Sequence, residues 1–118
     1  RVVGRHAWTR AAVVKRLTQW APRPGVDRNE AIRRWRTSHV PLVSQVPGVT
    51  RYVQNVCAPG PDGTDPPYAG LGELSFETLE DAHAALGTAE WQAVIDDASE
   101  FMDLEHMAAA WATEHSAF

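Results

Sequence analysis

One histidine on the apolar face of a predicted helix is the residue of this sequence best suited to chemistry. At about 100° per residue, Ile32, Trp35, His39 and Val43 fall on one face of a segment that begins near Asp27. Imidazole titrates near neutral pH, so it accepts or donates protons readily. A histidine in this setting is either a hydrogen-bonded core residue or an acid–base catalyst, and the pattern alone leaves both open.

Polar side chains on two later segments are suited to bind a substrate oxygen. Tyr52 and Gln54 share one face of a predicted strand, where they either orient a phenol or carbonyl group or form a satisfied polar pair at a subunit contact. Tyr68 follows a proline-rich loop and either closes a cavity mouth or packs against its neighbours. Glu73 is a strand carboxylate among apolar residues, so if buried it needs an ion-pair partner, such as Arg51, or a raised pKa.

The other reactive side chains do not form a pattern typical of a cofactor site. His106 and His115 each follow a glutamate, but their spacing is not the i, i+4 helical spacing of a zinc motif. Cys57 has no CxxC partner and is expected to be an inert thiol. The sequence has no glycine-rich phosphate loop and no serine-nucleophile motif. We therefore expect no metal, nucleotide or flavin.

Cap and breaker residues predict how the histidine is positioned. Asp27 and Glu30 have the spacing of a capping box, which predicts a helix from about residue 28. Pro41 should end or kink this helix, which puts His39 in its last turn. The dipole at that end favours a protonated imidazole whereas apolar burial opposes it, so the direction of the pKa shift stays open.

The remaining periodicity predicts the fold. Alternating segments predict strands over residues 12–20, 49–58, 68–76 and 108–115. A second helical region covers residues 78–86 and 90–99, broken at Gly87. The resulting order, β-α-β-β-α-β with an antiparallel sheet, is the ferredoxin-like α+β fold.

Several features predict room for a ligand within that fold. Residues 59–67 contain four prolines, and this loop has a length often used for a lid or cavity mouth. Gly70 and Gly72 leave space over one strand face for a ligand or a second backbone. Four tryptophans either line an apolar cavity or pack the core: Trp20, Trp35, Trp91 and Trp111.

Composition limits the class of partner. Fifteen acidic residues outnumber eleven Lys and Arg, with a formal net charge of -4, which argues against nucleic acid binding. One cysteine suits a reducing cytoplasm, and no apolar run approaches the length of a membrane helix. The length of 118 residues predicts one domain over residues 12–118. Residues 1–11 read as an extension, with a basic arm as the alternative.

Several short motifs in order resemble the EthD family of small dimeric α/β-barrel proteins. They are WRxxHxPL at 35–42, PGxxRYVQN at 47–55, PYxGxxELxF at 67–76, EW at 90–91, FxD at 101–103 and EH at 114–115. The resemblance covers roughly residues 12–118. It implies a homodimer in which the uncovered sheet faces of two subunits pack together into a barrel.

The resemblance also implies a function. Such proteins include cofactor-independent cyclases, dehydratases and isomerases, which implies proton transfer on a small aromatic or polyketide-like substrate in secondary-metabolite biosynthesis. One alternative is a cofactorless monooxygenase or oxygenase accessory protein in aromatic or ether metabolism, and another is a non-enzymatic ligand-binding dimer. The implied catalytic residues are His39 and Tyr52, and the implied substrate-binding residues are Trp35, Gln54, Asn55, Tyr68, Glu73, Trp91 and His115.

Overall fold

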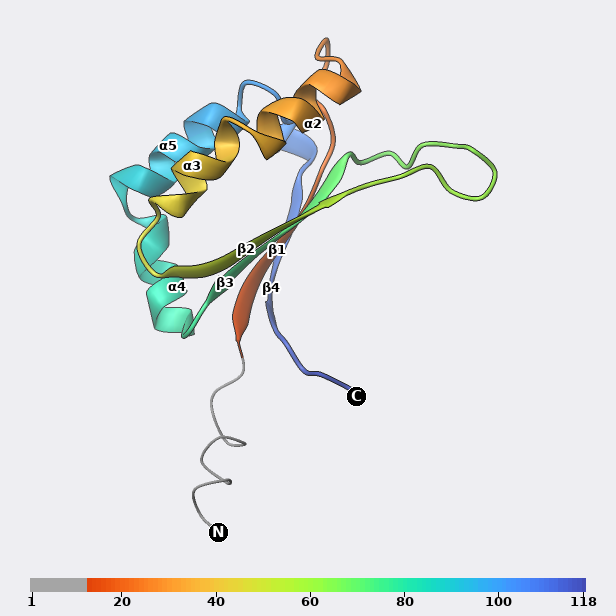
Figure 1. Cartoon of the computed structure of the whole chain (residues 1–118). Coiled ribbons are helices and arrows are strands. Elements are labelled where there is room, and N and C mark those ends of the chain that lie inside the picture. The colour runs from red at the N-terminus through yellow and green to blue at the C-terminus, as the bar shows by residue number, and fades with distance from the viewer. Residues whose placement is uncertain (1–12) are drawn as a thin grey trace.

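A four-stranded antiparallel sheet with helices on one face forms the body of the molecule (Figure 1). The computed structural model describes residues 13–118, so the predicted extension over residues 1–11 lies outside the described part. The strand order is β2-β3-β1-β4, which confirms the ferredoxin-like α+β prediction. The elements are β1 (Val14–Trp20), α2 (Arg28–Arg36), α3 (His39–Ser44), β2 (Val49–Val56), β3 (Gly70–Phe76), α4 (Leu79–Leu86), α5 (Ala89–Ala98), a 3₁₀ turn (Leu104–His106) and β4 (Ala108–Thr113).

The central strand β1 has two chemically different faces. It pairs antiparallel with β3 on one side and with β4 on the other. Because side chains alternate along a strand, Arg16 and Trp20 face the helices while Lys15 and Leu17 face the uncovered side. The alternation along this strand therefore separates a cavity-facing row from an outward-facing row.

The helix that carries the histidine ends earlier than predicted. α2 stops at Arg36, and His39 is the first residue of the separate helix α3, not part of a last turn. The backbone of Thr37, with φ -114° and ψ -83°, leaves the helical region and so ends α2, although its amide and hydroxyl both donate to the Arg33 carbonyl. Pro41 then falls in the first turn of α3, where a missing amide hydrogen costs no helical hydrogen bond. The prediction of one helix ending at Pro41 was wrong.

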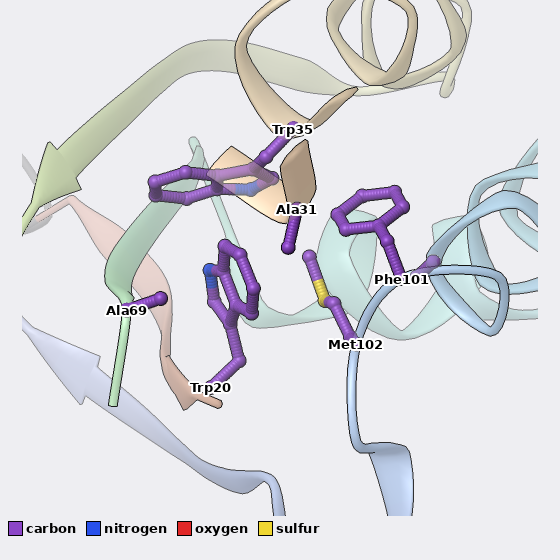
Figure 2. Packing of buried hydrophobic residues seen from close by; sticks show 7 residues of the cluster. Trp20, Ala31, Trp35, Ala69, Phe101 and Met102 are labelled. Atoms are coloured by element: carbon purple, nitrogen blue, oxygen red, sulfur yellow. The ribbon is translucent and has the colours of Figure 1, made fainter. Parts of the chain in front are cut away.

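Aromatic packing fills the space that was expected over β3. Trp20 and Trp35 meet edge to face at 5.2 Å, with Phe101 and Met102 beside them (Figure 2). A Cβ atom on Gly70 would lie 2.5 Å from Trp20 Nε1 and 2.6 Å from Trp35 Cζ3. The glycine therefore makes room for two buried indoles and not for a ligand, which corrects the expectation at this position.

This crowding makes a stability prediction. Gly70→Ala should lower the free energy of unfolding by about 1–3 kcal/mol, because overpacking displaces side chains that have no free space. Gly60→Ala, in the exposed loop where a Cβ meets only Asp62 Oδ1 at 3.5 Å, is the matched control and should change it by less than about 0.5 kcal/mol. Urea unfolding curves measure both, and equal effects would contradict the packing argument.

Candidate acid–base site

His39 and Asp97 form a hydrogen-bonded pair between helices α3 and α5. His39 Nδ1 lies 2.8 Å from Asp97 Oδ2, and the histidine is only 3% exposed. The imidazole also meets the Phe101 ring edge-on at 5.5 Å between centroids. Within residues 13–118, the other ring nitrogen, Nε2, has no hydrogen-bond partner. A carboxylate accepts a hydrogen bond from Nδ1–H, so this arrangement leaves the Nε2 lone pair available.

Burial keeps this imidazole neutral. Desolvation lowers the pKa of His39 below its ordinary value, and the hydrogen bond and charge of Asp97 offset only part of that effect. The Nδ1 contact is therefore a hydrogen bond from a neutral ring at pH 7 and not an ion pair. The sequence left the direction of the shift open, and the structure shows that it is downward. A neutral imidazole with a free nitrogen is the form required of a general base.

A cavity of about 50 Å³ lies between the sheet and the helices beside this pair. Its wall includes five of the predicted site residues: Trp35, His39, Tyr52, Glu73 and Trp91. The remaining lining is mainly apolar and comes from β1, α3, β3, α5 and the segment before β4, with Arg16 and Thr18 contributed by β1. This volume exceeds what a single water molecule needs and suits the reacting end of a small organic molecule.

Tyr52 adds a phenol whose orientation is fixed by its neighbour. Gln54 Nε2 donates to the Trp35 carbonyl at 2.8 Å and to the Tyr52 hydroxyl at 3.2 Å. Burial raises the pKa of Tyr52, so its hydroxyl stays protonated and can donate its own hydrogen. Gln54 is not part of the cavity wall; its contacts hold Tyr52 and Trp35 in place.

Glu73 and Asn55 belong to a different polar cluster, on the uncovered face of the sheet. Glu73 borders the cavity, yet its carboxylate accepts hydrogen bonds from Lys15 Nζ at 2.8 Å and from Asn55 Nδ2 at 3.0 Å. Lys15 Nζ also lies 2.6 Å from Glu114 Oε1. These hydrogen bonds, that of Lys15 first, lower the pKa of Glu73. Its ion-pair partner is thus Lys15 and not Arg51.

Two further predicted residues lie away from the cavity. The Tyr68 carbonyl accepts a hydrogen bond of 3.0 Å from Arg28 at the base of the proline loop, and that loop projects away from the helices (Figure 1). His115 follows β4 and its Nε2 lies 3.1 Å from Thr113 Oγ1. Over residues 13–118, no group of three His, Cys, Asp or Glu side chains is placed to hold a metal ion. No helix in the same range is long and apolar enough to span a membrane.

Sequence reasoning missed Asp97 and Arg16 as site residues. Asp97 precedes the buried Ala98 on α5, but its role depends on α5 lying beside α3, which no sequence spacing reveals. Arg16 lines the cavity, with its guanidinium carbon 5.1 Å from the centroid of the Trp91 ring. The alternation of residues along β1 does not show which of its two faces meets the helices.

The geometry defines a ferredoxin-like protein with a potential acid–base pair at a small internal cavity. The model of the EthD domain matches residues 23–105, and the chain belongs to the EthD family. An uncharacterised 11.0 kDa protein of the thcB-thcC intergenic region of Rhodococcus erythropolis is 34% identical over 67 residues. That match covers 57% of this chain and 64% of the relative, so the chain spans just under two-thirds of the relative's length.

Solved structures share the fold at low sequence identity. An EthD family protein, BH0200 of Bacillus halodurans C-125, has a TM-score of 0.73 at 20% identity, covering 87% of this chain and 99% of that one. The hydroxynitrile lyase of Passiflora edulis has a TM-score of 0.70 at 10% identity, covering 92% and 98%. SnoaB, a cofactor-independent oxygenase of Streptomyces nogalater, has a TM-score of 0.64 at 9% identity, covering 91% and 97%. At these identities the likeness concerns the fold.

Proposed function

We propose that this EthD-family protein is a cofactor-independent enzyme that transfers a proton on a small molecule. The observation that supports this most directly is the neutral His39 imidazole, held through Nδ1 by Asp97 in the cavity wall with Nε2 unpartnered within residues 13–118. A structural histidine in a core is expected to use both ring nitrogens or to pack without a neighbouring void. A cofactor-independent oxygenase and a lyase with the same fold add support.

The proposed reaction begins at Nε2, which removes a proton from a C–H group next to a carbonyl of the substrate. The electron pair left behind moves onto an adjoining carbonyl oxygen, to which the Tyr52 hydroxyl donates. The imidazolium is stabilised by Asp97 and returns the proton. Return to another carbon gives an isomer, and return to a departing hydroxyl releases water. If the enolate carbon instead bonds to a second carbonyl carbon of the substrate, the oxygen of that carbonyl becomes an alkoxide, and its protonation completes a ring closure. Trp35 and Trp91 limit the access of water to these steps.

The size of the cavity bears on the substrate. About 50 Å³ accommodates the reacting end of a molecule, so an aromatic or polyketide-like substrate would extend beyond it. We propose such a compound, in secondary-metabolite biosynthesis, as the finer assignment. Deuterium uptake from D₂O into small ketones, keto acids and phenols, without added metal or flavin, tests the proton transfer. Oxygen consumption under the same conditions would favour a monooxygenase, and binding with neither process would favour a non-enzymatic role.

We also propose that the protein is a homodimer joined through the uncovered sheet face. Leu17 and Leu71 are each 37% exposed on that face and border an open groove together with Ala108 and Ala110. An apolar sheet face left in water would lose the stabilisation that burial gives. The EthD family resemblance implies the same arrangement.

A charged side chain introduced on the uncovered sheet face tests whether that face forms the dimer interface. Leu17→Glu should raise the dimer dissociation constant by about tenfold or more, because the carboxylate would be buried without a partner. Leu79→Glu is the control, since Leu79 is 47% exposed on α4 in the helical layer. Light scattering across a concentration series gives the mass. A monomeric parent protein, or an equal effect of both substitutions, would refute the proposed interface.

A further inference from the structure

Arg16 is a charged cavity residue that lacks an acidic partner. It lies half-buried on β1, facing the helices, and its guanidinium has no ion pair or hydrogen bond within residues 13–118. Its cross-strand neighbours on both sides are apolar, Leu74 on β3 and Trp111 on β4. Burial alone lowers the pKa of Arg16, and no nearby carboxylate opposes that effect.

Arg16 is the one Lys or Arg among the described residues that line the cavity, whereas the unpaired Arg36 and Arg51 are exposed to water. Lys15, its neighbour in sequence, contacts both Glu73 and Glu114. Arg33 pairs with Glu30, and Arg28 donates to two backbone carbonyls. Taking a guanidinium out of water without an anion is costly, so such a group usually meets its partner when a ligand binds.

The contact of Arg16 with Trp91 leaves the N–H groups of the guanidinium free to bind an anionic ligand. The guanidinium carbon lies 5.1 Å from the indole centroid, a separation at which the cation is attracted to the ring face. An interaction with the face uses no N–H donor, so the edge of the fork stays open. A planar fork of N–H groups matches the two oxygens of a carboxylate.

The rest of the cavity wall offers mainly donors. Thr18 lies two residues from Arg16 on the same face of β1, and its hydroxyl has no hydrogen-bond partner in the described chain. The Tyr52 hydroxyl accepts from Gln54 and can donate its own hydrogen. Glu73 also borders the cavity, but its carboxylate is bound by Lys15 and Asn55, which leaves His39 Nε2 as an acceptor without a partner in the described chain. A cavity with several donors and one base fits a ligand that carries oxygen acceptors and one acidic hydrogen.

We infer that the substrate is a small organic carboxylate, held by the fork of Arg16 with its acidic hydrogen directed to His39. The inference rests on the proposed function, because it names the substrate class of the same cavity. As the proton leaves for His39, negative charge develops on the substrate, and the nearby guanidinium stabilises it. Arg16 thus binds the anion and supports the transfer step.

Binding of one matched pair of probes tests the inference without any turnover. The probes are 2-oxobutanoate and its uncharged amide, with affinities read from chemical-shift changes of the protein. The carboxylate should bind about 10- to 100-fold more tightly than the amide, as expected for hydrogen bonds to a charged group. Equal affinities, or no binding of either probe, would overturn the assignment.

Variants locate the source of that preference. Arg16→Met should remove it, and Arg16→Lys should retain only part, because an ammonium lacks the fork. Arg51→Met removes an arginine that lies on β2 outside the cavity wall and should leave the preference unchanged. If Arg51→Met lost the preference for the carboxylate probe while Arg16→Met kept it, the inferred role of Arg16 would also be overturned. The comparison of probes in the parent protein stands even if Arg16→Met fails to fold.

A variant of the base separates this inference from the proposed function. His39→Gln should keep the preference for the carboxylate while losing proton exchange. If the parent protein binds the carboxylate selectively but catalyses no exchange, the proposed function fails and the anion site stands. If exchange occurs with equal affinity for both probes, the anion site fails and the proposed function stands.

Discussion

His39→Gln should reduce the catalysed proton exchange by about 100-fold or more, the usual effect of removing a general base. Glutamine is close in size to histidine and its amide can still donate to Asp97, so the α3–α5 contact should survive. It has no nitrogen that accepts a proton near pH 7. Deuterium uptake into the best substrate of the panel, measured by mass spectrometry at equal protein concentration, gives the ratio of rates.

A second histidine provides a matched control. His106 Nδ1 lies 2.8 Å from Asp103 Oδ2, the same separation as in the His39–Asp97 pair, but the His106 side chain is 72% exposed. His106→Gln should leave the exchange rate unchanged. If the two substitutions act alike, or if His39→Gln is fully active while its thermal unfolding is unchanged, His39 is not the base.

Asp97→Asn should lower the rate by about 10- to 100-fold and also move its pH dependence. The carboxylate accepts from Nδ1 and so keeps the Nε2 lone pair free; an asparagine amide can donate to Nδ1 and favour the opposite tautomer. The reaction needs neutral His39, so its rate should rise with pH through the pKa of that group, below the ordinary value of about 6.5. Asp97 raises the pKa of His39. Removing its charge should therefore shift the rising limb to lower pH.

The pH profile distinguishes a positioning residue from a merely structural one. A variant with damaged packing would have a lower maximal rate at high pH, but the pH at which its rate rises would not change. Asp96→Asn is the control, because Asp96 is the exposed neighbour on α5 and accepts from Gln92 at 2.9 Å. It should change neither plateau nor limb. A limb that moves to higher pH in Asp97→Asn would contradict the assigned role.

Local patterns predicted the order of elements and the buried face of the histidine segment. Trp35, His39 and Val43 are all buried, as their spacing indicated. The same patterns could not place the end of α2, because the backbone of Thr37 leaves the helical region before Pro41 is reached. Strand ends were overestimated by about two residues, since pairing with a neighbour, and not alternation, decides where a strand stops.

The site was predicted in part because its residues come from distant segments. Spacing identified His39 and Tyr52, whereas Asp97 lies 58 positions from His39 along the chain. Its role follows from the packing of α3 against α5, a tertiary contact. Glu73 and Asn55 were grouped with the site because strand alternation does not reveal which face the helices cover. The family motif likewise marked Tyr68 and His115, which the fold places outside the cavity wall.

Trp20 pairs with Gly70 across the β1–β3 ladder, and this pairing fixes which side chains of β1 lie on each face of the sheet. A slip of β1 by one position would turn every side chain to the reverse surface. The ammonium of Lys15 would then enter the hydrophobic hollow, and the guanidinium of Arg16 would emerge among the glutamates. A large indole packed against the smallest residue does not fit any shifted register, so this one steric match keeps the two cations on opposite faces of the sheet.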